Sequence, residues 1–231
     1  MRVEDAAAIR ELPLFRDVAQ DAFARLLAAG FLQRFPPGVV LIRESDRADF
    51  LHVVVEGAAE LFAGTAGRET TIELVRPVGL FILAAVLNDQ VYLQSARTLE
   101  RSLILMLPAE NVRATMEADP AFMRAVVMKL ADDYRRTIRD LKNLKLRNGA
   151  ERLANWLIRA EFEQGGNGTM EIPVEKRTLA ARLGMTPENL SRAFATLTEH
   201  GVRTKGSSVH FADRSALIAY AKPDPLVDLP D

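Results

Sequence analysis

Three polar side chains with the chemistry to recognise DNA bases lie close together in the stretch TPENLSRAFATLTEHG, residues 186–201. Glu188 can accept a hydrogen bond from a cytosine amino group, Arg192 can donate two to guanine O6 and N7, and Ser191 can donate or accept. The spacing Glu-x-x-Ser-Arg therefore predicts a base-reading surface. The alternative is an ordinary solvated face, because acidic residues favour the first turn of any helix.

The surrounding residues predict that this stretch is a helix with a well-defined start. Thr186 is a good N-cap, and Pro187 suits the first helical position, where a missing N–H costs nothing. Leu190, Phe194 and Leu197 recur at intervals of four and three, so they share the buried face. The three polar side chains then project from the other side, near the end that enters the major groove in helix-turn-helix proteins.

Elements on both sides predict a winged helix-turn-helix over residues 148–222. A helix from Glu151 to Glu163 and the short strand TMEIPV come first. The helix in EKRTLAARLG, the link Met185-Thr186-Pro187 and the reading helix follow, and VRTKGSSVHF supplies two strands hinged at Gly206. This succession is typical of the winged helix-turn-helix.

The charge of the chain is unevenly distributed. Thirteen Lys or Arg against eight Asp or Glu between Lys142 and Lys222 give this region a net charge of +5, and the remainder carries -6. A basic module joined to an acidic one is typical of DNA binding by one half, with chance unevenness as the alternative. The expected phosphate contacts are Lys176, Arg177, Thr186, Asn189 and Lys205, with Arg182 and Arg203 as further candidates.

The first half of the chain has the texture of an antiparallel β domain. Between Phe35 and Leu107, short β-branched runs such as FLHVVVEG and SLILML alternate with turns containing Gly or Pro at intervals of roughly ten residues. We therefore predict an α+β protein in which residues 1–118 form a jelly-roll-like β-roll.

A long helix is expected over residues 119–147. Its apolar positions are spaced alternately by four and three residues, as in a coiled-coil seam, which predicts a homodimer. The alternative is packing of this helix against its own β domain. The seam residues are Met123, Val127, Leu130, Tyr134, Thr137, Leu141 and Leu144. The last residues, 223–231, contain prolines at 223, 225 and 230 and are expected to form an extended, flexible tail.

Composition excludes several classes of function. The sequence contains no cysteine, which rules out disulfides, thiolate-bound zinc and iron–sulfur clusters. No paired carboxylates, activated nucleophile or metal-ligand cluster is recognisable. We therefore expect that the protein has no catalytic residues and no metal site, and that it is not an enzyme. The longest apolar run, Val78 to Leu87, is too short for a membrane helix, and no signal segment is visible, which favours a cytoplasmic protein.

Over essentially the whole chain, the β-roll, the long helix and the segment TLAARLGMTPENLSRAFATLTEHGV resemble the CRP/FNR family of bacterial transcription regulators. The resemblance implies a homodimeric activator that binds double-stranded DNA and contacts RNA polymerase, with the β-roll as its sensor domain. Glu188-x-x-Ser191-Arg192 is similar to the signature of the FNR branch, which reads palindromes of TTGAT-type half-sites. The cyclic-AMP receptor branch has arginine and glycine where this chain has Pro187 and Ser191. Glu175 departs from the Thr or Ser of many relatives, so no phosphate contact is expected there.

The sensor half departs from the cyclic-nucleotide-binding relatives, which carry a Gly-Glu run and a later arginine that holds the phosphate. Here the glutamate position falls near Ala84 and the arginine position on Tyr92 or Gln94. Arg97 lies too far along the sequence to match the arginine position. Because neither Tyr92 nor Gln94 can neutralise a cyclic phosphate, cyclic AMP is not the expected ligand.

With cyclic AMP not expected and an iron–sulfur cluster excluded, the chain resembles the nitric-oxide-responsive denitrification regulators of the NnrR and DNR groups. This resemblance implies a nitrogen-oxide or low-oxygen signal and, in some members, haem, for which His52 is the only histidine of the sensor half. Two alternatives stay open: a switch driven by cyclic AMP or cyclic di-GMP, and a protein-interaction module whose winged helix does not bind DNA. The residues expected to line an effector pocket beside the long helix are Gly79, Phe81, Leu83, Tyr92 and Leu93.

Overall fold

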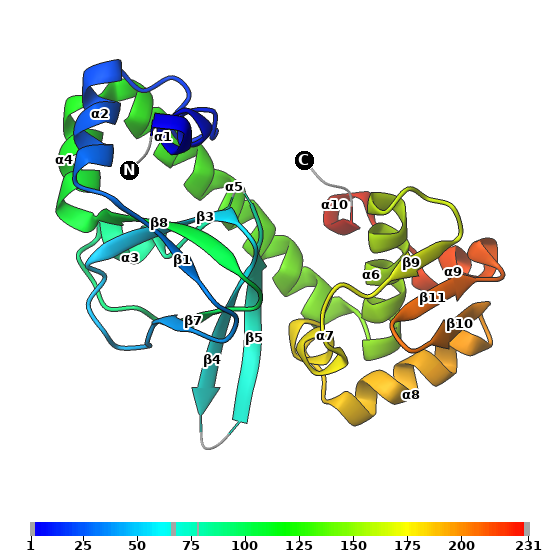
Figure 1. Cartoon of the computed structure of the whole chain (residues 1–231). Helices are drawn as coiled ribbons and strands as arrows, with labels where there is room; N and C mark the ends of the chain where they lie inside the picture. The colour runs from blue at the N-terminus through cyan, green and yellow to red at the C-terminus, as the bar shows by residue number, and fades with distance from the viewer. Residues whose placement is uncertain (1–2, 66–67, 78, 229–231) are drawn as a thin grey trace. The chain divides into compact units, whose positions relative to one another are not determined.

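The computed structural model describes residues 3–65, 68–77 and 79–228 of the chain. The chain forms two compact units that divide between Tyr134 and Arg135, inside one long helix (Figure 1). Among the described residues, no helix is both long and apolar enough to cross a membrane.

Two four-stranded antiparallel sheets build the first unit (Figure 1). One has the order β1-β8-β3-β6, from strands Phe31–Phe35, Ser102–Pro108, Phe50–Glu56 and Gly79–Phe81. The other has the order β2-β7-β4-β5, from strands Val40–Ile42, Ser95–Thr98, Ala59–Thr65 and Arg68–Val75. The helices of this unit are α1 (Val3–Arg10), α2 (Gln20–Ala28), α3 (Leu83–Leu87), α4 (Ala109–Ala118) and the first half of α5 (Pro120–Leu146).

The start of α5 is anchored in the core of the first unit. Phe122 is fully buried and stacks on Phe15, with the ring centroids 6.2 Å apart. Asp119 caps the helix, because its carboxylate accepts hydrogen bonds from the N–H of Phe122 at 2.9 Å and of Ala19 at 2.8 Å. Burial of a phenylalanine contributes about 1.5–3 kcal/mol and a cap about 1 kcal/mol, so this end of the helix is firmly held.

The second unit contains the second half of α5 and a winged helix-turn-helix (Figure 1). Its helices are α6 (Gly149–Glu163), α7 (Lys176–Arg182), α8 (Pro187–Thr198), α9 (Arg214–Ala221) and α10 (Pro225–Asp228). A three-stranded antiparallel sheet has the order β10-β11-β9, from Val202–Lys205, Ser208–Phe211 and Thr169–Glu171. Helices α6, α7 and α8 share one core, in which the buried leucines include Leu153, Leu157, Leu179, Leu190 and Leu197. The predicted α+β class, with a β-roll, a long helix and a winged helix-turn-helix, is confirmed.

The expected extended conformation of the tail is wrong for residues 225–228, which form the short helix α10. Asp224 stabilises its start by accepting a hydrogen bond from the Leu226 N–H at 2.9 Å, and Pro225 is tolerated because the first helical position needs no N–H. Asp228 pairs with Arg147, which is 81 positions away in the sequence, so no local pattern could reveal the contact. Residues 229–231 of the expected tail lie outside the described residues.

Candidate functional site

The helix that carries the predicted base-reading residues is fixed by its cap and by one buried face. The Thr186 hydroxyl accepts a hydrogen bond from the Asn189 N–H at 3.3 Å, and Pro187 occupies the first helical position. Such a cap contributes about 1 kcal/mol and defines where the helix begins. On the inner face Leu190, Ala193 and Leu197 are buried and Phe194 is half-buried.

Glu188, Ser191 and Arg192 are all exposed on the outer side of α8. The Ser191 hydroxyl donates to the main-chain oxygen of Pro187 at 3.0 Å, which leaves its own oxygen able to accept from a base. The pKa of Glu188 is lowered by its own main-chain N–H, by the Thr186 hydroxyl and by the nearby Arg192. Glu188 is therefore a carboxylate at neutral pH, as acceptance from a cytosine amino group requires.

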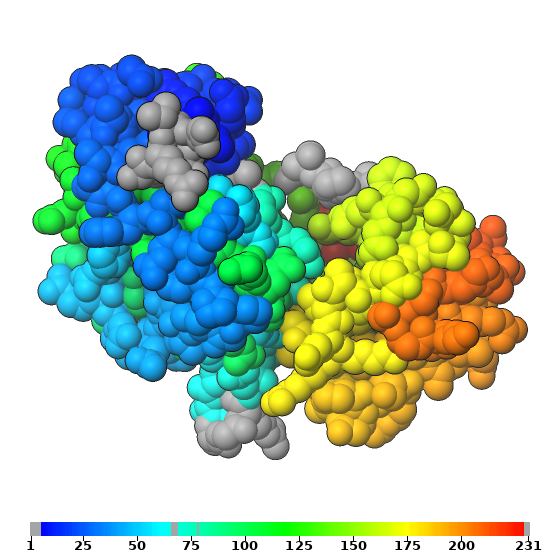
Figure 2. All heavy atoms as spheres, viewed as in Figure 1, coloured from blue at the N-terminus to red at the C-terminus, as the bar shows by residue number. Residues whose placement is uncertain are grey.

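Basic side chains lie on the elements next to α8. Figure 2 shows that α8 and the wing strands β10 and β11 reach the surface of the second unit. The Lys176 ammonium lies 5.9 Å from the centre of the Phe194 ring, so it covers part of the apolar face of α8. The predicted phosphate contacts that are exposed are Lys176, Arg177, Thr186, Asn189, Arg203 and Lys205.

Arg182 differs from the other candidate phosphate contacts. Its guanidinium lies 3.4 Å from the carboxylate of Asp140 on α5, and its side chain is only 28% exposed. Arg182 therefore ties α7 to the second half of α5.

Sequence reasoning missed Arg152, which ties α6 to the turn between α7 and α8. Its guanidinium donates to three carbonyl oxygens: Leu183 at 2.8 Å, Arg147 at 2.7 Å and Gly184 at 3.3 Å. Arg152 also lines, together with Arg192, a surface depression of about 320 Å³. No local pattern distinguishes this arginine from a surface residue, because its partners are assembled only by the fold.

A row of exposed side chains follows one side of α5. Leu130 is the exception, because it is half-buried and packs against the core of the first unit. Large apolar side chains that stay exposed along one helix are unusual unless a partner covers them. The exposed members of the predicted seam are Met123, Val127, Tyr134, Thr137, Leu141 and Leu144.

A cavity of about 810 Å³ lies beside α5 in the first unit. Its walls include Val53 of β3, Leu80 of β6 and the segment from Leu12 to Phe15. On α5 the lining residues are Pro120, Ala121, Arg124, Ala125, Met128, Lys129 and Asp132. A ligand in this cavity would touch both a sheet and the long helix.

The predicted effector residues do not line this cavity. Leu80 lines it and pairs with Val53 across the sheet, whereas the next residue, Phe81, points to the opposite face, as side chains alternate along a strand. Leu80, which lies between the predicted residues Gly79 and Phe81 in the sequence, therefore lines the cavity in their place. Gly79 is half-buried, Phe81, Leu83 and Tyr92 are buried, and Leu93 is exposed.

His52 is also separate from the cavity lining. It is 3% exposed, and its ring stacks on Phe81 with the centroids 5.2 Å apart. Burial lowers the pKa of His52 to about 4, so the imidazole is neutral, and its Nδ1 has no hydrogen-bond partner. No residue lining the cavity is a histidine, so the geometry does not support haem in this cavity with His52 as the axial ligand. The described residues contain no group of three or more His, Cys, Asp or Glu that could hold a metal ion.

We expect His52 to make the protein less stable in acid. Because its pKa falls from 6.5 to about 4 on folding, the stabilisation is complete above pH 6.5 and is lost as the pH falls towards 4. The linked change is about 3 kcal/mol. His52→Leu should flatten the pH dependence of the free energy of unfolding, measured with urea, whereas the exposed His210→Leu should not. A His52→Leu curve parallel to wild type would contradict this expectation.

Arg97 is neutralised by carboxylates of the protein itself. Its guanidinium lies 2.7 Å from Glu60 and 2.6 Å from Glu69, and it covers the Phe62 ring at 4.3 Å. Glu60 is buried and also accepts a hydrogen bond from the Thr71 hydroxyl at 2.5 Å. A guanidinium held by two carboxylates is poorly suited to bind a cyclic phosphate as well.

Two protein-family models match the chain, one in each compact unit. Residues 32–119 match the cyclic nucleotide-binding domain. Residues 151–220 match the Crp-like helix-turn-helix domain, which includes α7, α8 and the wing.

Similar proteins extend these matches over most of the chain. The transcriptional activator protein anr of Pseudomonas aeruginosa is 25% identical over 190 residues, which are 80% of this chain and 78% of that protein. A solved structure from Ruegeria pomeroyi DSS-3, provisionally assigned to cyclic nucleotide binding, is 26% identical in sequence. The match covers 96% of this chain and 100% of that chain, with a TM-score of 0.60. The sensor domain of the transcriptional regulator DNR from Pseudomonas aeruginosa is 16% identical, covering 55% of this chain and 90% of its own, with a TM-score of 0.50. This last likeness concerns the fold alone.

Proposed function

The chain belongs to the CRP/FNR family of DNA-binding transcription regulators, and from this premise we propose that it reads a palindrome of TTGAT-type half-sites. The observation that carries the proposal is the outer face of α8, where Glu188, Ser191 and Arg192 are exposed next to a capped N-terminus. This is the end of a recognition helix that contacts base edges.

The three side chains suit the single G·C pair of each TTGAT half-site. Arg192 donates two hydrogen bonds to guanine, and Glu188 accepts from the amino group of the paired cytosine. Ser191, one position before Arg192 in the chain, contacts a neighbouring base. Together these contacts specify one base pair on both of its strands.

The test is a comparison of two duplexes at one salt concentration. The full-length protein is titrated with labelled TTGAT-N4-ATCAA DNA and with a scrambled duplex of the same composition, because salt alters both affinities. We expect strong preference for the palindrome. Equal affinity for the two duplexes would overturn the proposal.

We propose that two copies bind together through α5. A symmetric dimer places its two reading helices on the two halves of a palindrome, which is the arrangement that the half-sites require. The exposed seam of α5 supports this assembly. We further propose that the bound dimer activates transcription by contacting RNA polymerase. Transcription in vitro from a promoter that contains the palindrome would test this step.

In this proposal, Lys205 contacts a DNA phosphate and raises the affinity by its charge, without reading a base. Lys205→Ala should weaken binding to both duplexes equally, because a phosphate contact carries no sequence information. Since each dimer would make two fewer phosphate interactions, the slope of log K against log salt should become shallower by about two. The exposed Lys145→Ala on α5 is the control and should change nothing. Loss confined to the palindrome would instead assign Lys205 to base reading.

We propose that the signal is nitric oxide, another nitrogen oxide or low oxygen, sensed by the β-roll. The cavity beside α5 supports this coupling, since a ligand bound there would favour one placement of the helix over another. An absorption spectrum of the protein purified from its native host, with and without nitric oxide, tests for a bound chromophore. Palindrome affinity that is the same with and without nitric oxide or another nitrogen oxide, in air and without oxygen, would contradict this signal.

A cyclic-nucleotide switch is the second candidate, favoured by the family match over residues 32–119. The carboxylates around Arg97 argue against it. Calorimetric titration with cyclic AMP and cyclic di-GMP decides between the two candidates, because micromolar binding of either would favour the switch.

A further inference from the structure

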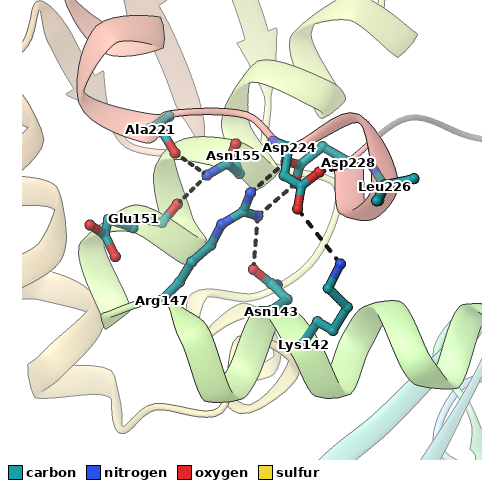
Figure 3. A network of polar contacts seen from close by, with 9 residues as sticks. All are labelled: Lys142, Asn143, Arg147, Glu151, Asn155, Ala221, Asp224, Leu226 and Asp228. Carbon is teal, nitrogen blue, oxygen red and sulfur yellow. Dashed lines mark hydrogen bonds and ion pairs between the residues drawn. The ribbon is translucent and has the colours of Figure 1, made fainter.

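The C-terminal segment and the junction between α5 and α6 form one polar network (Figure 3). The junction consists of Arg147 and Asn148. The Arg147 guanidinium donates two hydrogen bonds to the Asp228 carboxylate, at 2.7 and 2.5 Å, and another to Asn143 at 3.1 Å. The side chains of Arg147 and Asp228 are only 10% and 18% exposed. The two residues therefore form a bidentate ion pair that is largely shielded from water.

A second ion pair lies beside the first (Figure 3). The Lys142 ammonium is 3.6 Å from the Asp224 carboxylate. The Asp224 N–H also donates to the Asp228 carboxylate at 2.7 Å, which links the two acidic residues. Two carboxylates of the C-terminal segment thus face two cations at the end of α5.

The junction is connected to the turn that precedes the reading helix. The main-chain oxygen of Arg147 accepts a hydrogen bond from Arg152, which also holds the carbonyls of Leu183 and Gly184. Leu144 packs so closely on Gly184 that a Cβ there would lie 2.7 Å from the leucine Cδ2. Hydrogen bonds and close packing therefore connect the end of α5 to the turn before α8.

We propose that Asp228 and Arg147 are positioning residues for the reading helix, and that residues 224–228 form a strap across the α5–α6 junction. Without the Asp228 carboxylate, the largely shielded guanidinium of Arg147 would lose its bidentate partner, and the junction would have to open to hydrate it. The shift would reach the turn before α8 through Arg152. The inference rests on the proposed function, because a dimer binds a palindrome only when both reading helices are correctly placed.

The test uses the full-length protein and three variants. Asp228→Asn removes the charge with little change of shape, and Asp228→Glu restores it. Glu163→Gln is the matched control, because Glu163 pairs with Arg159 on the exposed surface of α6. We expect Asp228→Asn to lose on the order of tenfold in affinity for the palindrome, within the usual range of coupling between sites, with little change on scrambled DNA. Asp228→Glu should recover most of the loss, and Glu163→Gln should match wild type.

Hydrogen exchange separates positioning from general stability. In Asp228→Asn, faster exchange should be confined to residues 143–148 and 182–186, while α6 and α8 keep their protection. Unchanged affinity in Asp228→Asn, no recovery in Asp228→Glu, or faster exchange throughout α6 to α9 would each overturn the strap. If wild type itself shows no preference for the palindrome, the proposed function fails, and the exchange pattern still tests the strap without DNA.

Discussion

Replacing Arg192 by alanine should remove most of the preference for the palindrome over scrambled DNA. The side chain is exposed at the N-terminal part of α8, and its removal would take one bidentate guanine interaction from each half-site. Each such interaction contributes about 1–3 kcal/mol of discrimination. The expected loss is therefore about 2–6 kcal/mol, or roughly 30-fold to 20,000-fold in affinity for the palindrome.

The measurement is a titration of both duplexes at matched salt, with Arg159→Ala as the control. Arg159 is an exposed arginine on α6, so its removal changes the charge equally without touching α8. An equal loss on both duplexes for Arg192→Ala would make Arg192 a phosphate contact. If the Arg192→Ala protein still supported full transcription from the promoter, a winged helix that binds protein partners would be favoured instead.

Val127→Glu should dissociate the proposed dimer and, with it, abolish tight binding to the palindrome. Val127 is 52% exposed on α5 although it is apolar. In a two-fold seam, burial of the two valines would contribute about 1.5 kcal/mol each, and together they account for roughly a 150-fold change in the dimer dissociation constant. Two facing glutamates add a desolvation cost and mutual repulsion.

Leu146→Glu is the control, because Leu146 is another large apolar side chain of α5 and is 72% exposed. It lies two positions after the seam residue Leu144 and therefore points about 200° around the helix from it, away from the seam. Sedimentation over a range of protein concentrations should show a monomer for Val127→Glu and a dimer for Leu146→Glu. A stable dimer in both variants would place the contact away from this seam, as expected if α5 only packs on its own β domain.

The reading helix could be predicted closely from the sequence because its determinants are local. Thr186 and Pro187 specify the start, and the spacing of Leu190 and Leu197 specifies the buried face, so the exposed position of Glu188, Ser191 and Arg192 follows from helical geometry. The β-roll was predictable for the same reason, since strand texture and turn residues are local signals.

The residues that line the cavity beside α5 were not predictable from the sequence. The expected effector residues came from the chain segment between Gly79 and Leu93, but a strand places neighbours on opposite faces, and only the assembled sheet determines which face meets α5. Leu80 rather than Phe81 lines the cavity for this reason. Seam residue Leu130 illustrates the same limit, because the heptad spacing cannot show that this side chain packs on the first unit.

By itself, the sequence determined the class of protein, the order of its elements and the exposed face of α8, because these depend on periodicity, caps and turns within a few residues. The tertiary structure alone decided which residues join distant parts of the chain. Asp228 meets Arg147 from 81 positions away, and Arg152 gathers three carbonyls from the junction and the turn before α8. Such contacts satisfy charges and carbonyls that local structure leaves unpaired, so they exist only once the fold brings their partners within hydrogen-bonding distance.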